Sequence, residues 1–185
     1  MKPTALIPAC LLLLAFPLIA QDRDPVQPVP EAERRRAALG EFRSLIGTWR
    51  GEGTWRKGSY TEAWTVQEVL GGTHLQAQCK LESEGKTLHE FILYFLHDLE
   101  EDRPALHYLD EHSYVHLLGK TKTPSSGVTY EPVIQLTHEH DMLFRLEKKS
   151  IDEVRFTVLM RDAPDQEYEA RFDTRLARAG AAQEK

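Results

Sequence analysis

The sequence is poor in cysteine and contains no asparagine. Its 185 residues include two cysteines, Cys10 and Cys79. N-glycosylation is excluded because its acceptor is an Asn side chain. Cys10 lies in an N-terminal apolar run that we expect to be removed, so Cys79 has no partner within the mature chain and no internal disulfide is expected. Cys79 alternates with Leu75, Ala77 and Leu81, a pattern that predicts a buried strand position.

The sequence has no excess of positive charge. Lys and Arg number 23 against 29 Asp and Glu, which gives a formal net charge of −6. Because phosphate binding requires a cationic surface, we expect no nucleic-acid partner. The basic run Arg34–Arg36 lies among Glu31, Glu33 and Glu41 and is predicted to be a solvated helix face.

Catalytic motifs are also missing. The chain has no Gly-x-Ser-x-Gly elbow, phosphate-binding loop, dinucleotide fingerprint or His-Glu-x-x-His. Its paired carboxylates, such as Glu100 and Glu101, fall in predicted turns, where solvation explains them. No general acid and base can be nominated, and the sequence predicts a protein that is not an enzyme.

The first 20 residues have the pattern of a signal peptide. Lys2 is followed by an apolar stretch from Ala5 to Ala20, and the small Ala20 precedes the polar Gln21. The stretch is too short for a typical membrane span. Lipidation at Cys10 is not expected because the apolar run continues after it. We therefore expect a secreted or periplasmic protein with no integral membrane segment after cleavage.

Composition divides the rest of the chain. Residues 21–30 are rich in proline and predict an extended linker. Residues 31–46 predict an amphipathic helix, with Ala38, Phe42, Leu45 and Ile46 on one stripe. Residues 47–176 predict a β-barrel domain, and residues 177–185 a disordered tail.

The segment from residue 47 onward alternates like β-strands. Gly71–Gly72 predicts a two-residue hairpin turn, and further turn signals recur every 8–12 residues or so. Alternating sets, each expected to point to one side, are Phe91, Leu93 and Phe95; Tyr114, His116 and Leu118; Ile134 and Leu136; Met142, Phe144 and Leu146; Val154, Phe156, Val158 and Met160; and Tyr168, Ala170 and Phe172.

About nine short strands with one apolar face must hide that face and their edges. This favours an all-β fold, a single up-and-down antiparallel barrel of about 8–10 strands, over a two-sheet sandwich. The preceding helix would plug one end. The pattern does not decide between a hollow barrel and a filled one.

The string Gly47-Thr48-Trp49-Arg50-Gly51-Glu52-Gly53 resembles the start of the first strand in lipocalins. Together with Val69-Leu70-Gly71-Gly72-Thr73-His74-Leu75 it resembles a bacterial family of secreted, lipocalin-like (calycin-type) barrels of uncharacterised activity. The resemblance implies a barrel in which an Arg of the closing strand, Arg171 or Arg175, stacks on Trp49.

The same glycine-rich string is similar to nitrobindin-type haem-binding barrels, which implies haem as an alternative cofactor. Their ligating histidine lies in the closing strand, and residues 166–176 contain none. His138 and His140 are the nearest histidines and fall at a predicted turn. Their spacing suits a metal ion, but no third ligand is identifiable. His89 and His97 flank Phe91, Leu93 and Phe95 on one face.

The leading interpretation is an exported, non-catalytic barrel that binds one small apolar ligand in its lumen. Alternatives are the haem-binding barrel and a filled barrel that serves as an envelope scaffold or interaction module. The sequence leaves the ligand and the oligomeric state open. The predicted ligand-lining residues are Trp49, Gly51, Gly53, Trp64, Phe91, Phe95, Tyr114 and Phe144.

Overall fold

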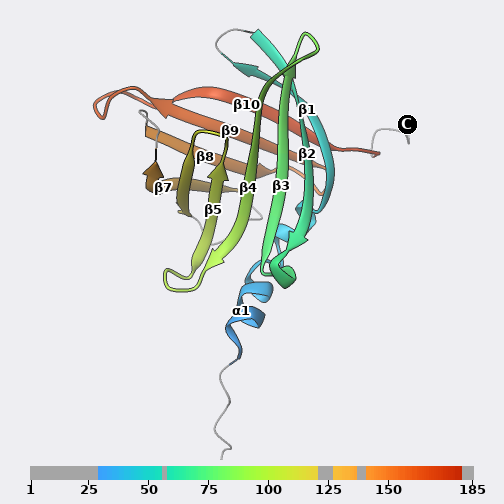
Figure 1. The fold of residues 1–185 in the computed structure, drawn as a ribbon, viewed down its shortest axis with the longest axis vertical. Helices are drawn as coiled ribbons and strands as arrows, with labels where there is room; N and C mark the ends of the chain where they lie inside the picture. The colour runs from blue at the N-terminus through green and yellow to red at the C-terminus, as the bar shows by residue number, and fades with distance from the viewer. Residues whose placement is uncertain (1–28, 56–57, 121–126, 137–140, 181–185) are drawn as a thin grey trace, which may run out of the picture.

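The computed structural model describes residues 29–55, 58–120, 127–136 and 141–180. These residues form one short helix and ten antiparallel strands that close into a barrel, as the sequence predicted (Figure 1). Each strand pairs with its neighbour in sequence, and β1 pairs with β10 to close the ring. The elements are α1 (Glu31–Ala38), the 3-10 turn η1 (Phe42–Leu45), β1 (Gly47–Trp55), β2 (Gly58–Val69), the 3-10 turn η2 (Leu70–Gly72), β3 (His74–Ser83), β4 (Lys86–Asp98), β5 (Arg103–Leu109), β6 (Tyr114–Gly119), β7 (Val128–Leu136), β8 (Asp141–Lys148), β9 (Glu153–Arg161) and β10 (Glu169–Arg178).

Alternation along the strands produces the core. In β3 the side chains of Leu75, Ala77, Cys79 and Leu81 are buried, which confirms the predicted position of Cys79. Inward residues of the other strands join them in one continuous cluster that fills much of the barrel. The fold is therefore held together by burial of apolar side chains.

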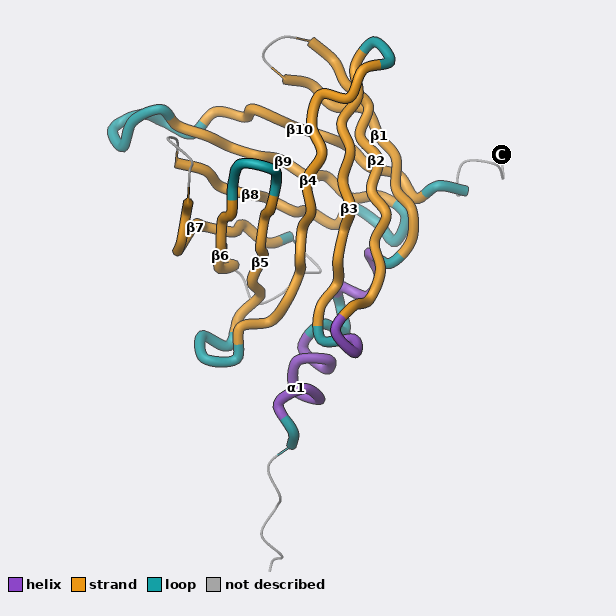
Figure 2. The backbone as a smooth tube through the Cα atoms, viewed as in Figure 1, coloured by secondary structure: helices purple, strands orange, loops and turns teal. Residues whose placement is uncertain are grey.

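The predicted helix over residues 31–46 is broken. α1 ends at Ala38, and Gly40, a poor helix former, lies in the turn before η1. No residue of α1 is buried. It projects from the end of the barrel where the chain enters β1 (Figure 2). Leu39, Phe42 and Leu45 close that end instead, each at most 4% exposed.

The basic run of α1 is not simply solvated. Arg35 donates a hydrogen bond to the His97 carbonyl at 2.8 Å, and Arg36 donates one to the Gly71 carbonyl at 2.9 Å. Both acceptors lie near the β4–β5 and β2–β3 turns, so the arginines tie the helix to the barrel end.

The Gly71–Gly72 turn is longer than predicted. Leu70, Gly71 and Gly72 all have positive φ angles, of 51°, 67° and 80°, and strand pairing resumes at His74. The connection is thus a four-residue turn, residues 70–73, with three residues in left-handed backbone conformation, rather than a two-residue hairpin turn.

The closing strand supplies an arginine to Trp49, but it is Arg178 and neither predicted residue. β10 continues two residues beyond the predicted limit of 176, and its register pairs Arg178 with Trp49. The Arg178 guanidinium carbon lies 4.3 Å from the Trp49 ring centroid. Arg178 also donates hydrogen bonds to the carbonyls of Ser44 at 2.6 Å and Ile46 at 2.8 Å. Arg178 therefore connects the closing strand β10 to the Trp49 ring and to η1, which covers this end of the barrel.

Replacing Arg178 with Met is expected to lower the free energy of unfolding by about 2–3 kcal/mol, because two backbone carbonyls of the η1 segment and the buried indole lose their partner. Denaturant unfolding followed by tryptophan fluorescence measures this. Arg175→Met is the control, since Arg175 is exposed on the same strand. Equal effects of the two substitutions would contradict this role of Arg178.

Within the described ranges, no helix has the length and apolar character needed to cross a membrane.

Candidate functional site

The barrel interior contains a cavity of about 320 Å³ at the end away from α1. Its walls come from β1–β5 and β8–β10. Phe91, Tyr108, Phe144 and Phe156 form an aromatic belt around it. The full lining is Trp55, Glu62, Leu81, Leu88, His89, Phe91, Tyr108, Asp110, Met142, Phe144, Phe156, Val158, Met160 and Phe172. A cavity of this size and character suits a small, mainly apolar molecule.

Ring contacts hold the belt in place. The Phe91 and Tyr108 centroids lie 5.3 Å apart, Tyr108 and Phe144 5.4 Å, and Phe144 and Phe156 6.0 Å. Phe156 meets the Trp64 ring edge to face at 5.0 Å. Aromatic side chains bring large apolar area with few rotatable bonds, so the walls are preorganised.

Two of the eight predicted site residues line this cavity, Phe91 and Phe144. Trp49, Trp64 and Phe95 are buried but lie in the packed core, with Trp49 donating to the Leu45 carbonyl at 2.7 Å. Phe95 stacks on Phe42 of η1, one of the side chains that close this end of the barrel, with ring centroids 5.9 Å apart. Trp49 and Phe95 support the closed end of the barrel, whereas Trp64 packs behind the cavity wall, against Phe156 and Glu62.

The two predicted glycines serve close packing. A Cβ on Gly51 would lie 1.8 Å from the Arg175 carbonyl oxygen, so Gly51 lets β10 approach β1. A Cβ on Gly53 would lie 2.3 Å from the Tyr60 ring, so the space at Gly53 is filled by that ring. Neither glycine leaves room for a ligand.

Tyr114 was assigned to the wrong face. The inward residues of β6 are Val115 and Leu117, which are in the core cluster, whereas Tyr114 contacts His107 from β5, with ring centroids 5.5 Å apart. β6 carries apolar or aromatic residues on both faces, so alternation alone does not select one. The pairing of β6 with β7 also shifts register between His116 and Leu117. The predicted inward pair Ile134 and Leu136 is likewise exposed.

A buried carboxyl group lies against the cavity and was missed by the sequence analysis. Glu62 is 2% exposed. Its Oε1 accepts a hydrogen bond from Trp64 Nε1 at 2.6 Å, and its Oε2 accepts one from Thr174 Oγ1. Tyr60 Oη lies 2.5 Å from the same Thr174 oxygen. In the sequence, Glu62 lies midway between Tyr60 and Trp64, at the two-residue spacing of the buried face of β2. This spacing could have indicated that the Glu62 side chain points inward.

The environment of Glu62 favours its neutral form. Burial raises the pKa of Glu62 to about 7, although the hydrogen bonds from Thr174 and Trp64 oppose this shift. Glu62 makes no ion pair with Lys or Arg in the described part of the chain. It is therefore a carboxyl group poised to change charge near neutral pH.

A second polar group lies at the rim. His89 Nε2 lies 2.6 Å from Tyr108 Oη, and Tyr108 donates to Asp110 Oδ2 at 2.7 Å. Burial lowers the pKa of His89, while Asp110 acts in the opposite direction. Hydrogen bonds from Tyr108 and the His112 amide hold the pKa of Asp110 below its usual value despite burial. His89 lines the cavity together with Phe91, the residue with which it was expected to share a face. His97 lies toward the other end, 3.3 Å from Asp102.

Among the residues that the structure describes, those lining the cavity do not offer a free histidine to ligate a haem iron. His89 is the histidine in the cavity lining, and its Nε2 is engaged by Tyr108 with Asp110 Oδ2 3.5 Å away. No cluster of three metal-binding side chains occurs among the residues that the structure describes. His138 and His140 lie outside those residues.

Fold and site together define a class: a closed, up-and-down antiparallel β-barrel with a largely apolar interior cavity and a buried carboxyl group. No family model matches the chain, and no curated protein matches it.

Proposed function

We propose that this protein is a lipocalin-like barrel that binds one small, largely apolar molecule in its cavity without converting it chemically. The observation that carries the proposal is the aromatic-walled cavity of about 320 Å³ inside an otherwise packed barrel. A ligand burying roughly 300 Å² of apolar surface would gain about 7 kcal/mol before the costs of association. That gain suffices for useful affinity with few polar contacts.

The proposed setting is outside the cytoplasm. It is supported by the signal-peptide pattern of Lys2 and the stretch Ala5–Ala20. The intact mass of exported protein is expected to correspond to a chain that begins at Gln21. A retained Met1 would contradict it.

Filling the cavity tests the binding function. Val158 lines the cavity, so Val158→Phe places a larger side chain in the empty space. We expect at least a tenfold loss of affinity for the neutral probe 1-naphthylmethanol, measured by calorimetry, with no large loss of stability. Leu159→Phe is the matched control, because the neighbouring residue is outside the cavity lining and half-buried.

Three results would count against this function. Unchanged affinity in Val158→Phe would place the probe elsewhere. No binding of any naphthyl compound, together with solid packing of the lumen in an experimental structure, would favour a scaffold or interaction module. A Soret band on haem titration that disappears with substitution of one histidine would favour a haem barrel.

A further inference from the structure

The charge of Glu62 sets a requirement on what occupies the cavity. A carboxylate removed from water is stable only when it is paired and hydrogen-bonded. Glu62 has hydrogen bonds from Trp64 and Thr174, but none of the described Lys or Arg side chains forms an ion pair with it. The charge of an ionised Glu62 is therefore left for a ligand to neutralise.

The hydrogen bonds around Glu62 can also support its ionised form. When Glu62 is ionised, Thr174 donates its single hydroxyl proton to Glu62 Oε2, and Tyr60 Oη can then donate to Thr174 across their 2.5 Å contact. Trp64 Nε1 is a donor only. Two donors then point at the carboxylate and a third supports them. A carboxylate has about four acceptor positions, and these contacts use two of them.

The rest of the cavity wall is apolar near Glu62. Phe156, Val158 and Phe172 share the lining with it. We propose that the cavity selects small apolar amines, with the ammonium group paired to the Glu62 carboxylate and the hydrocarbon body against the aromatic belt. This assignment rests on the proposed binding function and specifies the ligand class of the same cavity.

Other titratable groups face Glu62 from the neighbouring strands. Burial raises the pKa of Tyr60 on β2 and of Cys79 on β3, so both are neutral near pH 7. His89 on β4 lies at the rim, and burial lowers its pKa. Burial raises the pKa of Tyr108 on β5, while the lowered pKa of Asp110, the residue after β5, keeps that carboxyl group ionised. Among the acidic groups, Glu62 is the one whose pKa is raised to about 7.

Affinity for an amine should therefore fall as the pH is lowered. Burial raises the pKa of Glu62 to about 7, so the ionised fraction falls about tenfold from pH 8 to pH 6, while an alkyl ammonium stays protonated. We expect 1-naphthylmethylamine to bind about tenfold more weakly at pH 6 than at pH 8. A neutral ligand that accepted a hydrogen bond from protonated Glu62 would show the opposite trend.

The test compares probes that share one ring system: 1-naphthylmethylamine, which is cationic, and 1-naphthylmethanol, which is neutral. Calorimetry at pH 8 is expected to give the amine at least tenfold tighter binding to the wild-type protein. Glu62→Gln, which keeps the shape of the side chain, is expected to abolish this preference and the pH dependence while binding of the alcohol persists. Thermal unfolding confirms that the variant is folded.

Glu52→Gln is the matched control, because it makes the same chemical change at an exposed position outside the cavity lining. It is expected to leave the preference for the amine within about twofold of wild type. Loss of the preference in Glu52→Gln, or its retention in Glu62→Gln, would overturn the role of Glu62. Tighter binding of the alcohol than of the amine would overturn the ligand class yet leave the binding function standing. No binding of either probe would count against the binding function itself.

Discussion

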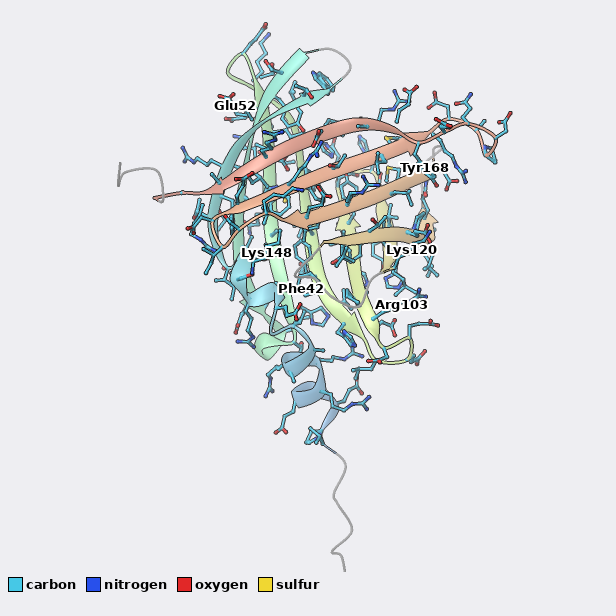
Figure 3. All side chains as sticks on the ribbon, turned by 180° about the vertical axis from the view of Figure 1, so that it is seen from behind. Phe42, Glu52, Arg103, Lys120, Lys148 and Tyr168 are labelled. Atoms are coloured by element: carbon cyan, nitrogen blue, oxygen red, sulfur yellow. The ribbon has the colours of Figure 1, made fainter. Side chains whose placement is uncertain are left out.

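Replacing Gly51 with Ala is expected to destabilise the barrel by more than about 3 kcal/mol, because the added methyl has no space. The new Cβ would lie 1.8 Å from the Arg175 carbonyl oxygen and 2.7 Å from its carbonyl carbon. Both are backbone atoms that a side-chain rotation cannot move. β1 and β10 pair to close the ring, on the side of the barrel seen in Figure 3, and they would have to separate.

Denaturant unfolding measures this loss, and Gly40→Ala is the control. A Cβ on Gly40 would lie 3.2 Å from the Ala37 carbonyl oxygen, in an exposed turn outside the barrel. Its expected effect is within about 1 kcal/mol. If Gly51→Ala were no more destabilising than Gly40→Ala, the close approach of β1 and β10 would be wrong.

The second prediction with a large effect is that Glu62 makes the free energy of unfolding depend on pH. Its folded-state pKa is raised from 4.5 to about 7 by burial. Between these values the folded protein holds a proton that the unfolded chain has lost. The stabilising protonated state is thus fully present below about pH 4.5, and stability declines as the pH rises through 7, by about 3 kcal/mol in all.

Glu62→Gln isolates this contribution, because other titrating groups are common to both proteins. Urea unfolding from pH 4.5 to pH 8 is expected to show the variant gaining about 3 kcal/mol relative to wild type. Stability curves that stay parallel over this range would show that Glu62 is not buried in the folded state.

The barrel fold was predictable from the sequence because the alternation of apolar and polar residues within each strand shows which face is buried. Alternation in β4, β8 and β9 marks one buried face, and a single apolar face on consecutive strands can be hidden by closure. Phe91 and Phe144 were placed in the lumen by this reasoning. It failed in β6, where both faces are apolar, and in the helix, where Gly40 ends the pattern early.

The sequence did not predict which part of the barrel interior is packed core and which part is cavity. Trp49, Phe95 and Phe144 all have inward positions, yet whether an inward ring packs in the core or borders the cavity depends on which strands bring side chains opposite it. Strand register sets this, since it carries Arg178 onto Trp49 and Val158 beside Phe144. Glu62 was overlooked because a charged residue at a strand position is normally assigned to the solvent face.

The central claim is that a ligand occupies the hollow end of the barrel. Met142 and Met160 both line that cavity and face each other across β8 and β9. With methyl-¹³C methionine, titration of 1-naphthylmethylamine is expected to shift both methyl resonances with one saturating 1:1 isotherm, and Val158→Phe to abolish the shift. Saturable binding that leaves both methyl resonances unmoved would contradict the account.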